Sequence, residues 1–465
     1  MLPTIATGNV ASATASTGYT VANSCRFNDD DSAYMHKTCS SAFDTDRWTI
    51  SIWFKRGTLG IHTRLITCDN GDGSDDDYIR FDTDDKMEFM IYSGGVVGLL
   101  KPNRVFRDPN AWMHLVCVWD SANGTAGNRM RMYINGVEET SFETDTNPSS
   151  GANATFGNTS HAIEIGQRGY NTSQYWDGYM AEVAVCDGQA YAASDFGEFS
   201  EDSPNIWMPK DISGLTFGTS GFYLDFEDSS NLGNDANGGT DFTEVNLAAT
   251  DQATDTPTNN FCTMNPLVPT TNITFSEGNC KMATHPSSDT YGGGIGTFGL
   301  TAGKWYWEIK MASLLGNHTH GVISELTAEL YQNVTGLQMD TGVTNFRNDD
   351  GGEMIKDGTQ TTADYGTFDD GDIMGIAFNA DDNQISIYDN GSAIVSNYAI
   401  STTRGTLFPY IGSGINTTFE VNFGGCPAFA ITSGNADANG YGNMEFAVPE
   451  NYYVLCSANL AEFGG

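Results

Sequence analysis

The chain has 465 residues, with 53 glycines, 13 prolines and 12% aromatic residues, a composition typical of short strands joined by tight turns. Lysine and arginine number 21 and aspartate and glutamate 59, so the formal net charge is −38. This excess of negative charge excludes binding to nucleic-acid phosphates and to anionic membranes. The length suits two domains of roughly 200 residues each.

The first twenty residues, Met1 to Thr20, are polar and lack a basic segment followed by an apolar run. We therefore expect no secretion signal, and no stretch of the chain reaches the apolar length of a membrane helix. Nine cysteines lie far apart without a Cys-x-x-Cys pair, and several fall within apolar strand patterns. We expect mostly reduced, buried thiols in a protein that folds in a reducing cytoplasm.

Alternating apolar residues predict strands through the first half of the chain. Residues 48–54 place Trp48, Ile50, Ile52 and Phe54 on one face, whereas residues 112–119 are apolar on both faces, as an inner strand would be. Residues 129–134 alternate and lead into Asn135-Gly136, the pair that favours a type I′ hairpin turn. Residues 180–186 form the next predicted strand.

The second half repeats this pattern. Residues 304–310 and 372–378 alternate, and residues 385–389 lead into a second Asn-Gly pair at Asn390-Gly391. No long amphipathic helix is predicted. Residues 231–269 are rich in Asn, Asp, Gly and Thr, which indicates a break between two domains. We expect an N-terminal arm at 1–20, a first domain at 21–247, a linker at 248–269 and a second domain at 270–465.

Two family resemblances follow these motifs in order. Residues 20 to 200 contain four motifs in order: the Ile52-Trp53-Phe54 strand, the Trp112-Met113-His114-Leu115 strand, the Tyr133-Ile134-Asn135-Gly136 hairpin and the closing Asp177-Gly178-Tyr179-Met180-Ala181-Glu182-Val183 strand. Together these motifs resemble a laminin G-like, or concanavalin A-like, domain. The second half contains three further motifs: Gly303-Lys304-Trp305-Tyr306-Trp307-Glu308, Gly371-Asp372 with Gly375-Ile376-Ala377, and Val421-Asn422-Phe423-Gly424. These motifs resemble a SPRY domain. The resemblance implies an all-β protein of two antiparallel concanavalin A-like sandwiches, of jelly-roll type, in tandem.

The connecting segment carries a third resemblance. It consists of Gly221 to Phe226, Ala249 to Gln252 and Asp255 to Phe261. This segment is similar to the link between these two domains in proteins of tailed phages. This resemblance implies a non-enzymatic virion surface protein, such as a tail fibre or receptor-binding protein. The expected partners are other virion proteins and a host-surface glycan or receptor, and we expect a homo-oligomer made in the host cytoplasm.

Catalysis has little support in the residues. Glucanases of this fold carry their carboxylates as Glu-x-Asp-x-Glu or a close variant on one strand, and no such run occurs. No Gly-x-Ser-x-Gly elbow is present either. His318-Thr319-His320 would place two imidazoles on one face of a strand, so the segment is either a metal site or a polar loop. A glycan-degrading depolymerase remains an alternative to pure binding.

The acidic run from Asp69 to Asp77 is the candidate metal site. Asp69, Asp72, Asp75 and Asp77 supply carboxylate oxygens among glycines, the ligand type that Ca²⁺ prefers, although the spacing is not that of an EF-hand. The other interpretation is a solvated acidic loop.

Tyr170, Asn171, Tyr175 and Trp176 are the candidate ligand-binding residues. Aromatic faces stack on sugar rings while amides satisfy hydroxyls. Packing of Trp176 beneath a turn is the alternative.

At the level of the whole chain, a structural or decorative role on a phage head or tail is the alternative to host recognition. The apolar residues 446–455 either dock to other proteins or form a last strand.

Overall fold

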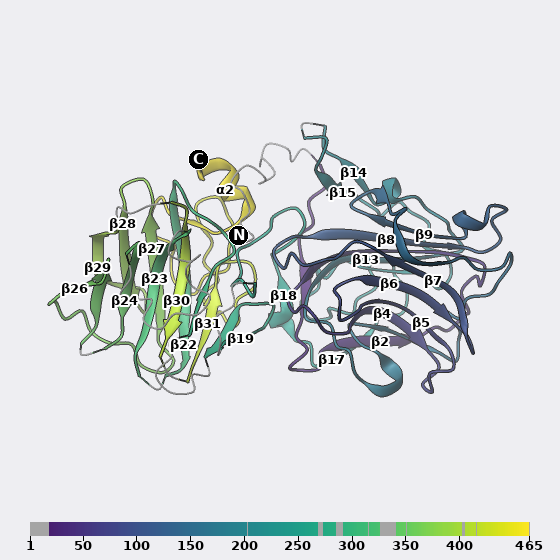
Figure 1. Ribbon diagram of the computed structural model, residues 1–465, viewed down its shortest axis with the longest axis horizontal. Helices are drawn as coiled ribbons and strands as arrows, with labels where there is room; N and C mark the ends of the chain where they lie inside the picture. Colours follow the sequence, from purple (N-terminus) through teal and green to yellow (C-terminus); the bar gives the residue numbers. More distant parts are fainter. Residues whose placement is uncertain are drawn as a thin grey trace. The chain divides into compact units, whose positions relative to one another are not determined.

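The computed structural model describes residues 18–201, 203–267, 273–284, 292–314, 316–325, 341–349, 351–401, 405–414 and 416–464. Of these, residues from Gly18 to Thr258 belong to one compact unit, and residues from Asn259 onward belong to a second. Both units consist almost entirely of antiparallel strands (Figure 1). In the described residues no helix is long and apolar enough to cross a membrane.

Two eight-stranded sheets form the N-terminal unit. The first has the order β10-β9-β8-β3-β13-β1-β18, with β16 beside β13. Its strands are β1 (Ser24–Phe27), β3 (Arg47–Arg56), β8 (Met113–Asp120), β9 (Met130–Ile134), β10 (Val137–Glu138), β13 (Gly178–Asp187), β16 (Phe222–Leu224) and β18 (Gln252–Ala253). The second has the order β11-β7-β6-β5-β4-β12-β2-β17. Its strands are β2 (Tyr34–Thr38), β4 (Thr63–Asp69), β5 (Asp76–Phe81), β6 (Met87–Tyr92), β7 (Val96–Pro102), β11 (Phe142–Thr146), β12 (Ala162–Ile165) and β17 (Thr243–Val245).

The inward residues of these two sheets pack into one core, which makes the unit a β-sandwich. Trp48, Ile50, Ile52 and Phe54 of β3 all belong to this core, as the alternation predicts. Met130, Met132 and Ile134 of β9 join them. Asn135 and Gly136 follow β9 with φ of 48° and 77°, which confirms the predicted type I′ turn.

The first sheet is also covered on its outer face. Val116 and Val118 of β8 pack there with Phe196, Phe217 and other residues of a second apolar cluster, so β8 is buried on both faces as predicted. This covering layer includes a hairpin of β14 (Gly197–Phe199) and β15 (Trp207–Pro209) and the short turn η4 (Ala193–Asp195). A further turn, η5 (Ala249–Asp251), precedes β18. The outer face of the second sheet is therefore the one left for polar residues.

The C-terminal unit is a second sandwich of two sheets around one core. One sheet has the order β19-β20-β31-β22-β27-β28-β29, and β32 pairs with β22 in parallel. Its strands are β19 (Ile273–Ser276), β20 (Lys281–Thr284), β22 (Lys304–Ser313), β27 (Ile373–Asn379), β28 (Gln384–Asp389), β29 (Ser392–Ala399), β31 (Thr417–Asn422) and β32 (Tyr453–Val454). The other has the order β21-β30-β23-β24-β25-β26. Its strands are β21 (Gly292–Ile295), β23 (His318–Ser324), β24 (Val343–Arg347), β25 (Glu353–Lys356), β26 (Thr359–Gln360) and β30 (Leu407–Ser413).

The end of the chain packs onto its own unit. The buried carboxylate of Glu308 on β22 accepts the backbone N–H groups of Glu445 at 2.9 Å and Phe446 at 2.8 Å. Val454 and Leu455 are fully buried beyond it, and helix α2 (Ser457–Phe463) follows. Residues 446–455 were expected either to dock to other proteins or to form a last strand. The structure shows the second, because this segment packs against its own unit and contains β32.

The predicted linker at 248–269 is divided between the two units. Up to Thr258 it packs in the N-terminal unit, where β18 pairs with β1 and Asp255 is buried. From Asn259 to Leu267 it packs in the C-terminal unit, where Phe261, Cys262 and Met264 are buried.

Candidate functional site

The outer face of the second sheet of the N-terminal unit, here called the polar face, carries polar side chains across its middle strands. Strand register places one residue from each strand in a row: His36, Glu164, Thr67, Tyr78, Met90 and Leu99, from β2 to β7. The residues that alternate with them, such as Ile163 and Ile79, point into the core. The polar face is therefore a direct product of period-two alternation on six adjacent strands.

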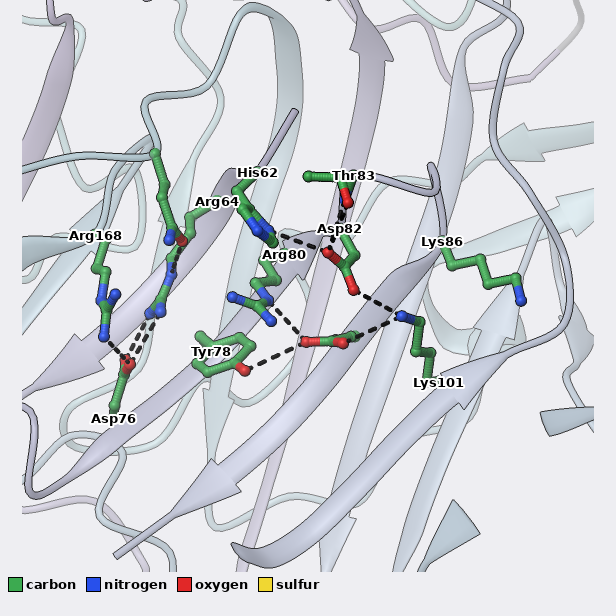
Figure 2. A network of polar contacts seen from close by, with 12 residues as sticks. His62, Arg64, Asp76, Tyr78, Arg80, Asp82, Thr83, Lys86, Lys101 and Arg168 are labelled. Atoms are coloured by element: carbon green, nitrogen blue, oxygen red, sulfur yellow. Dashed lines mark hydrogen bonds and ion pairs between the residues drawn. The ribbon is translucent and has the colours of Figure 1, made fainter. Parts of the chain in front are cut away.

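Arg64 organises one half of this face. Its guanidinium binds both carboxylate oxygens of Asp76, at 2.5 and 2.9 Å, and Asp76 also lies 3.5 Å from Arg168 (Figure 2). The Arg64 guanidinium lies 4.0 Å from the centre of the Tyr78 ring. Bidentate pairing fixes orientation as well as charge, so this group holds the loop that carries Arg168 in one place.

A second network occupies the other half. Glu88 accepts hydrogen bonds from Arg80 at 2.7 Å and Tyr78 at 3.3 Å, and Lys101 reaches Asp82 at 2.7 Å (Figure 2). Although burial opposes the shift, the bond from Lys101 lowers the pKa of Asp82 to about 2. The cations of the face are thus matched by carboxylates at hydrogen-bonding distance.

The loop between β12 and β13 covers the edge of this face. Arg64 holds it through Gln174, whose side-chain oxygen accepts from Nε at 3.0 Å and whose backbone oxygen accepts from the Arg64 N–H at 3.0 Å. Thr172 and Gln174 adopt positive φ values of 44° and 57°. Non-glycine residues adopt this conformation rarely and hold it where the surroundings fix it, so the loop has one defined shape.

The predicted metal and ligand segments come together at this loop. The backbone N–H of Tyr170, in the turn η3 (Gly169–Asn171), donates to Asp69 at 3.0 Å. The ring of Tyr170 lies against Gly73 in the acidic run, and Arg168 lies 4.4 Å from the centre of the same ring. Sequence reasoning treated these segments as separate sites, whereas the structure makes them neighbours.

Three of the four predicted ligand-binding residues lie where a ligand can meet them. Tyr170 and Asn171 are exposed, and Tyr175 is half-buried with its ring centre 6.3 Å from that of Tyr34. Trp176 differs from the expectation, because it is fully buried against Phe54 and Phe81 in the core. A buried ring cannot stack on a sugar, so the alternative interpretation, packing beneath a turn, describes Trp176.

The four predicted metal ligands point to different partners. Asp69 ends β4, and Asp72 and Asp75 lie in the hairpin loop, where they accept from the Ser74 N–H and the Ser93 hydroxyl. Asp77 belongs to β5 and points inward, where it accepts the N–H groups of Tyr92 and Thr155. Burial raises the pKa of Asp77 to about 7. Within the described ranges, no three or more His, Cys, Asp or Glu side chains are placed to hold a metal ion.

Glu164 is the residue that sequence reasoning missed. It lies in the middle row of the polar face, beside His36 and Thr67, and its side chain is beneath Gly169. Burial, followed by repulsion from Asp69, raises the pKa of Glu164 to about 8. The alternation Ala162-Ile163-Glu164-Ile165 could have placed it on an outer face, but no local pattern shows which strands lie beside it.

His318 and His320 lie on the buried strand β23 of the C-terminal unit rather than in a polar loop. The Nδ1 of His318 and the Nε2 of His320 are 2.7 Å apart, and both rings pack against Phe419. A groove of about 610 Å³ near the ends of these strands is lined by Asn317, Asp349, Asp369 and their neighbours. Among the described residues that line it, none has a buried side-chain atom without a hydrogen-bond partner to indicate a ligand.

Two family models match the chain. Residues 28–193 match the concanavalin A-like lectin/glucanases superfamily, and residues 304–426 match the SPRY domain. The chain thus contains a concanavalin A-like domain followed by a SPRY domain, both β-sandwich folds, and the polar face belongs to the first. No curated protein sequence matches the chain.

Solved structures of three kinds are similar to parts of the chain. The SPRY domain of human HERC1 shares 15% identity, with 36% of this chain and 99% of that one covered and a TM-score of 0.29. A putative carbohydrate binding protein from Bacteroides ovatus shares 16% identity, with 49% and 58% covered and a TM-score of 0.33. A heptameric SAP-like pentraxin from Limulus polyphemus shares 14% identity, with 43% and 100% covered and a TM-score of 0.29.

Proposed function

We propose that the N-terminal unit binds glycans through the polar face and the loop that carries Tyr170 and Tyr175. The observation that carries this proposal is the juxtaposition of half-exposed aromatic rings with fixed polar side chains. Tyr34, His36 and Tyr175 form one group of rings. The ring centres of His36 and Tyr175 lie 5.8 and 6.3 Å from that of Tyr34. Aromatic faces beside amide, carboxyl and guanidinium groups are the combination that a sugar ring and its hydroxyls need.

We infer that the protein acts by binding rather than by catalysis. The polar side chains of Arg64, Asp76, Arg80 and Glu88 are engaged with one another, which suits a preorganised surface. The depolymerase alternative predicts new reducing ends when the intact protein is incubated with a polysaccharide. Release at a rate above that of a heat-treated sample would replace the binding function with hydrolysis.

The finer proposal concerns the particle on which the protein acts. The tandem of the two domains and the Gly221 to Phe261 connection support a surface protein of a tailed-phage virion, with a host-surface glycan or receptor and other virion proteins as partners. Immunogold labelling of particles with antibody against this chain tests it. Label at fibre tips supports host recognition, whereas dense label over the head supports the decorative alternative.

The binding function is tested with the full chain on an array of bacterial and algal polysaccharides, in buffers with Ca²⁺ and with a chelator. Retention of the protein on at least one glycan is expected. Absence of binding to every polysaccharide in both buffers would overturn the proposal. A matched sample of the Tyr170→Ala, Tyr175→Ala double variant shows whether the signal comes from this face.

A further inference from the structure

We propose that Glu164, Gln167 and Arg168 form a subsite that binds a hydroxyl group of an uncharged sugar, with Glu164 as its specificity-determining residue. This inference rests on the glycan-binding function proposed above and adds the class of sugar and the residue that selects it. The three residues lie within five positions of the chain, from Glu164 on β12 to Arg168, which directly precedes η3. Glu164 lies against Gly169 of η3 and beside His36 of the ring group.

The first argument is that three buried polar atoms lack a hydrogen-bond partner in the described part of the structure. They are Oε2 of Glu164, Oε1 of Gln167 and Nε of Arg168. Glu164 is only 9% exposed and Gln167 only 1%. A buried polar group left without a partner costs about 1–3 kcal/mol, so three within five residues indicate a group that is bound there.

The chemistry of these atoms defines the missing group. Gln167 Oε1 accepts a hydrogen bond, Arg168 Nε–H donates one, and a carboxyl oxygen of Glu164 can take part in either sense. A hydroxyl group both donates and accepts, so it can satisfy all of them at once. An ammonium only donates and a carboxylate only accepts, and neither complements the set.

The surrounding charges also favour an uncharged ligand. The two guanidinium groups of Arg64 and Arg168 face the carboxylate of Asp76, and the carboxylate of Asp69 lies at the same loop, so the cations there are already matched by carboxylates. The net charge of −38 repels acidic polysaccharides over the whole chain. An uncharged sugar needs no unpaired cation and is not repelled by the net negative charge.

The protonation state of Glu164 fits this class of ligand. The titratable and charged groups around it are Asp69 and Arg64 on β4, Asp76 on β5, Tyr34 and His36 on β2, and Arg168 in the loop. Burial and Asp69 raise the pKa of Glu164 to about 8, so at neutral pH the carboxyl is mostly uncharged. An uncharged carboxyl can be covered by a sugar without burying a charge, whereas ionisation above pH 8 opposes binding.

The test measures affinities of the full chain for three soluble oligosaccharides by calorimetry: laminarihexaose as the uncharged probe, an oligoguluronate as the anionic probe and a chitosan hexamer as the cationic probe. The uncharged probe is expected to bind best at pH 6. At pH 9, with about one tenth of Glu164 protonated, its dissociation constant should rise about tenfold. Tightest binding of a charged probe would overturn the inference.

Variants assign the effect to Glu164. Glu164→Gln cannot ionise and keeps a donor and an acceptor, so it should bind the uncharged probe at pH 9 as well as at pH 6. Gly169→Ala places a methyl group against the Glu164 carboxylate, at a residue whose backbone tolerates a side chain, and should weaken binding at both pH values. Glu198→Gln, at an exposed residue of β14 outside the polar face, is the control and should keep the affinity and the pH dependence of the unmodified chain.

The outcomes separate this inference from the glycan-binding function. If the three atoms hold only an ordered water, the uncharged probe binds but Glu164→Gln leaves its pH dependence unchanged, and the inference alone fails. If none of the three probes binds while a polysaccharide on the array is retained, the class of sugar is wrong and the binding function stands. If nothing binds in either experiment, both fail.

Discussion

The ammonium of Lys55 and the carboxylate of Asp255 lie 2.7 Å apart, and neither side chain is more than 2% exposed. The second carboxylate oxygen of Asp255 accepts the indole N–H of Trp112 at 2.8 Å. Lys55 lies on β3, and Asp255 follows β18, 200 residues later in the chain. The pair therefore fastens the last segment of the N-terminal unit to its central strands.

Removal of one partner should destabilise this unit strongly. Asp255→Ala leaves the Lys55 charge and the Trp112 N–H without this carboxylate in a buried position, and we expect a loss of about 3–5 kcal/mol in the free energy of unfolding. Guanidinium denaturation followed by tryptophan fluorescence measures it. Lys86 and Glu143 form an exposed pair on the same unit, so Glu143→Ala is the control, with an expected change below about 1 kcal/mol. Equal effects of the two substitutions would contradict the structural role of Asp255.

A buried imidazole should hold its proton on one nitrogen. The ring of His114 stacks on that of Trp53, and its Nδ1 accepts the indole N–H of Trp207 at 2.9 Å. The proton therefore resides on Nε2, which lies 2.8 Å from the hydroxyl of Ser51. Trp207→Phe should cost about 1–3 kcal/mol by leaving Nδ1 without its donor. Nitrogen-15 NMR of the imidazole reads the tautomer directly, and a proton found on Nδ1 would disprove this arrangement.

Local alternation explains how much of the fold the sequence predicts. Met130, Met132 and Ile134 face the core because β9 has one polar and one apolar face, and the Asn-Gly pair that follows closes the hairpin. The same reasoning failed at Asp77, which the acidic run suggested to be in a loop. Its carboxylate is used inside the unit to accept two backbone N–H groups, a role that composition cannot reveal.

The candidate site was predicted only in part because it depends on strand register. Tyr170 and Tyr175 were recognised as aromatic residues in a polar loop, and the structure places them at the rim of the polar face. Glu164 was missed because its neighbours His36 and Thr67 come from strands far away in the sequence. Trp176 is aromatic like the Tyr175 that precedes it, but its side chain points into the core.

The aromatic residues of the covering loop should separate binding from stability. Tyr170→Ala is expected to weaken glycan binding severalfold or more with little change in unfolding, because the ring is exposed. Trp176→Ala is expected to remove about 3–5 kcal/mol of stability, because it empties a site in the core. Thermal unfolding and glycan affinity, measured on the same samples, test both. A fully stable Trp176→Ala protein would contradict the burial of this ring.

The paired imidazoles of His318 and His320 should make the C-terminal unit sensitive to acid. Burial lowers the pKa of His318 to about 3 and that of His320 well below its ordinary value of 6.5. Both rings stay neutral in the folded unit, while the unfolded chain takes up two protons below pH 6.5. Stability is therefore complete above pH 6.5 and falls as the pH drops from there toward 3, by up to about 2.7 kcal/mol per pH unit for the two rings.

Hydrogen exchange of peptides that contain β23, measured at several pH values and corrected for the intrinsic rate, reports the opening free energy of this region. His320→Leu removes one of the two protons taken up, so the slope of stability against pH should fall to about half. His36→Gln, a substitution of a half-buried histidine in the N-terminal unit, should leave the slope unchanged. If the slope in His320→Leu equals that of the unmodified chain, the acid sensitivity of this unit has another origin than the buried imidazole pair.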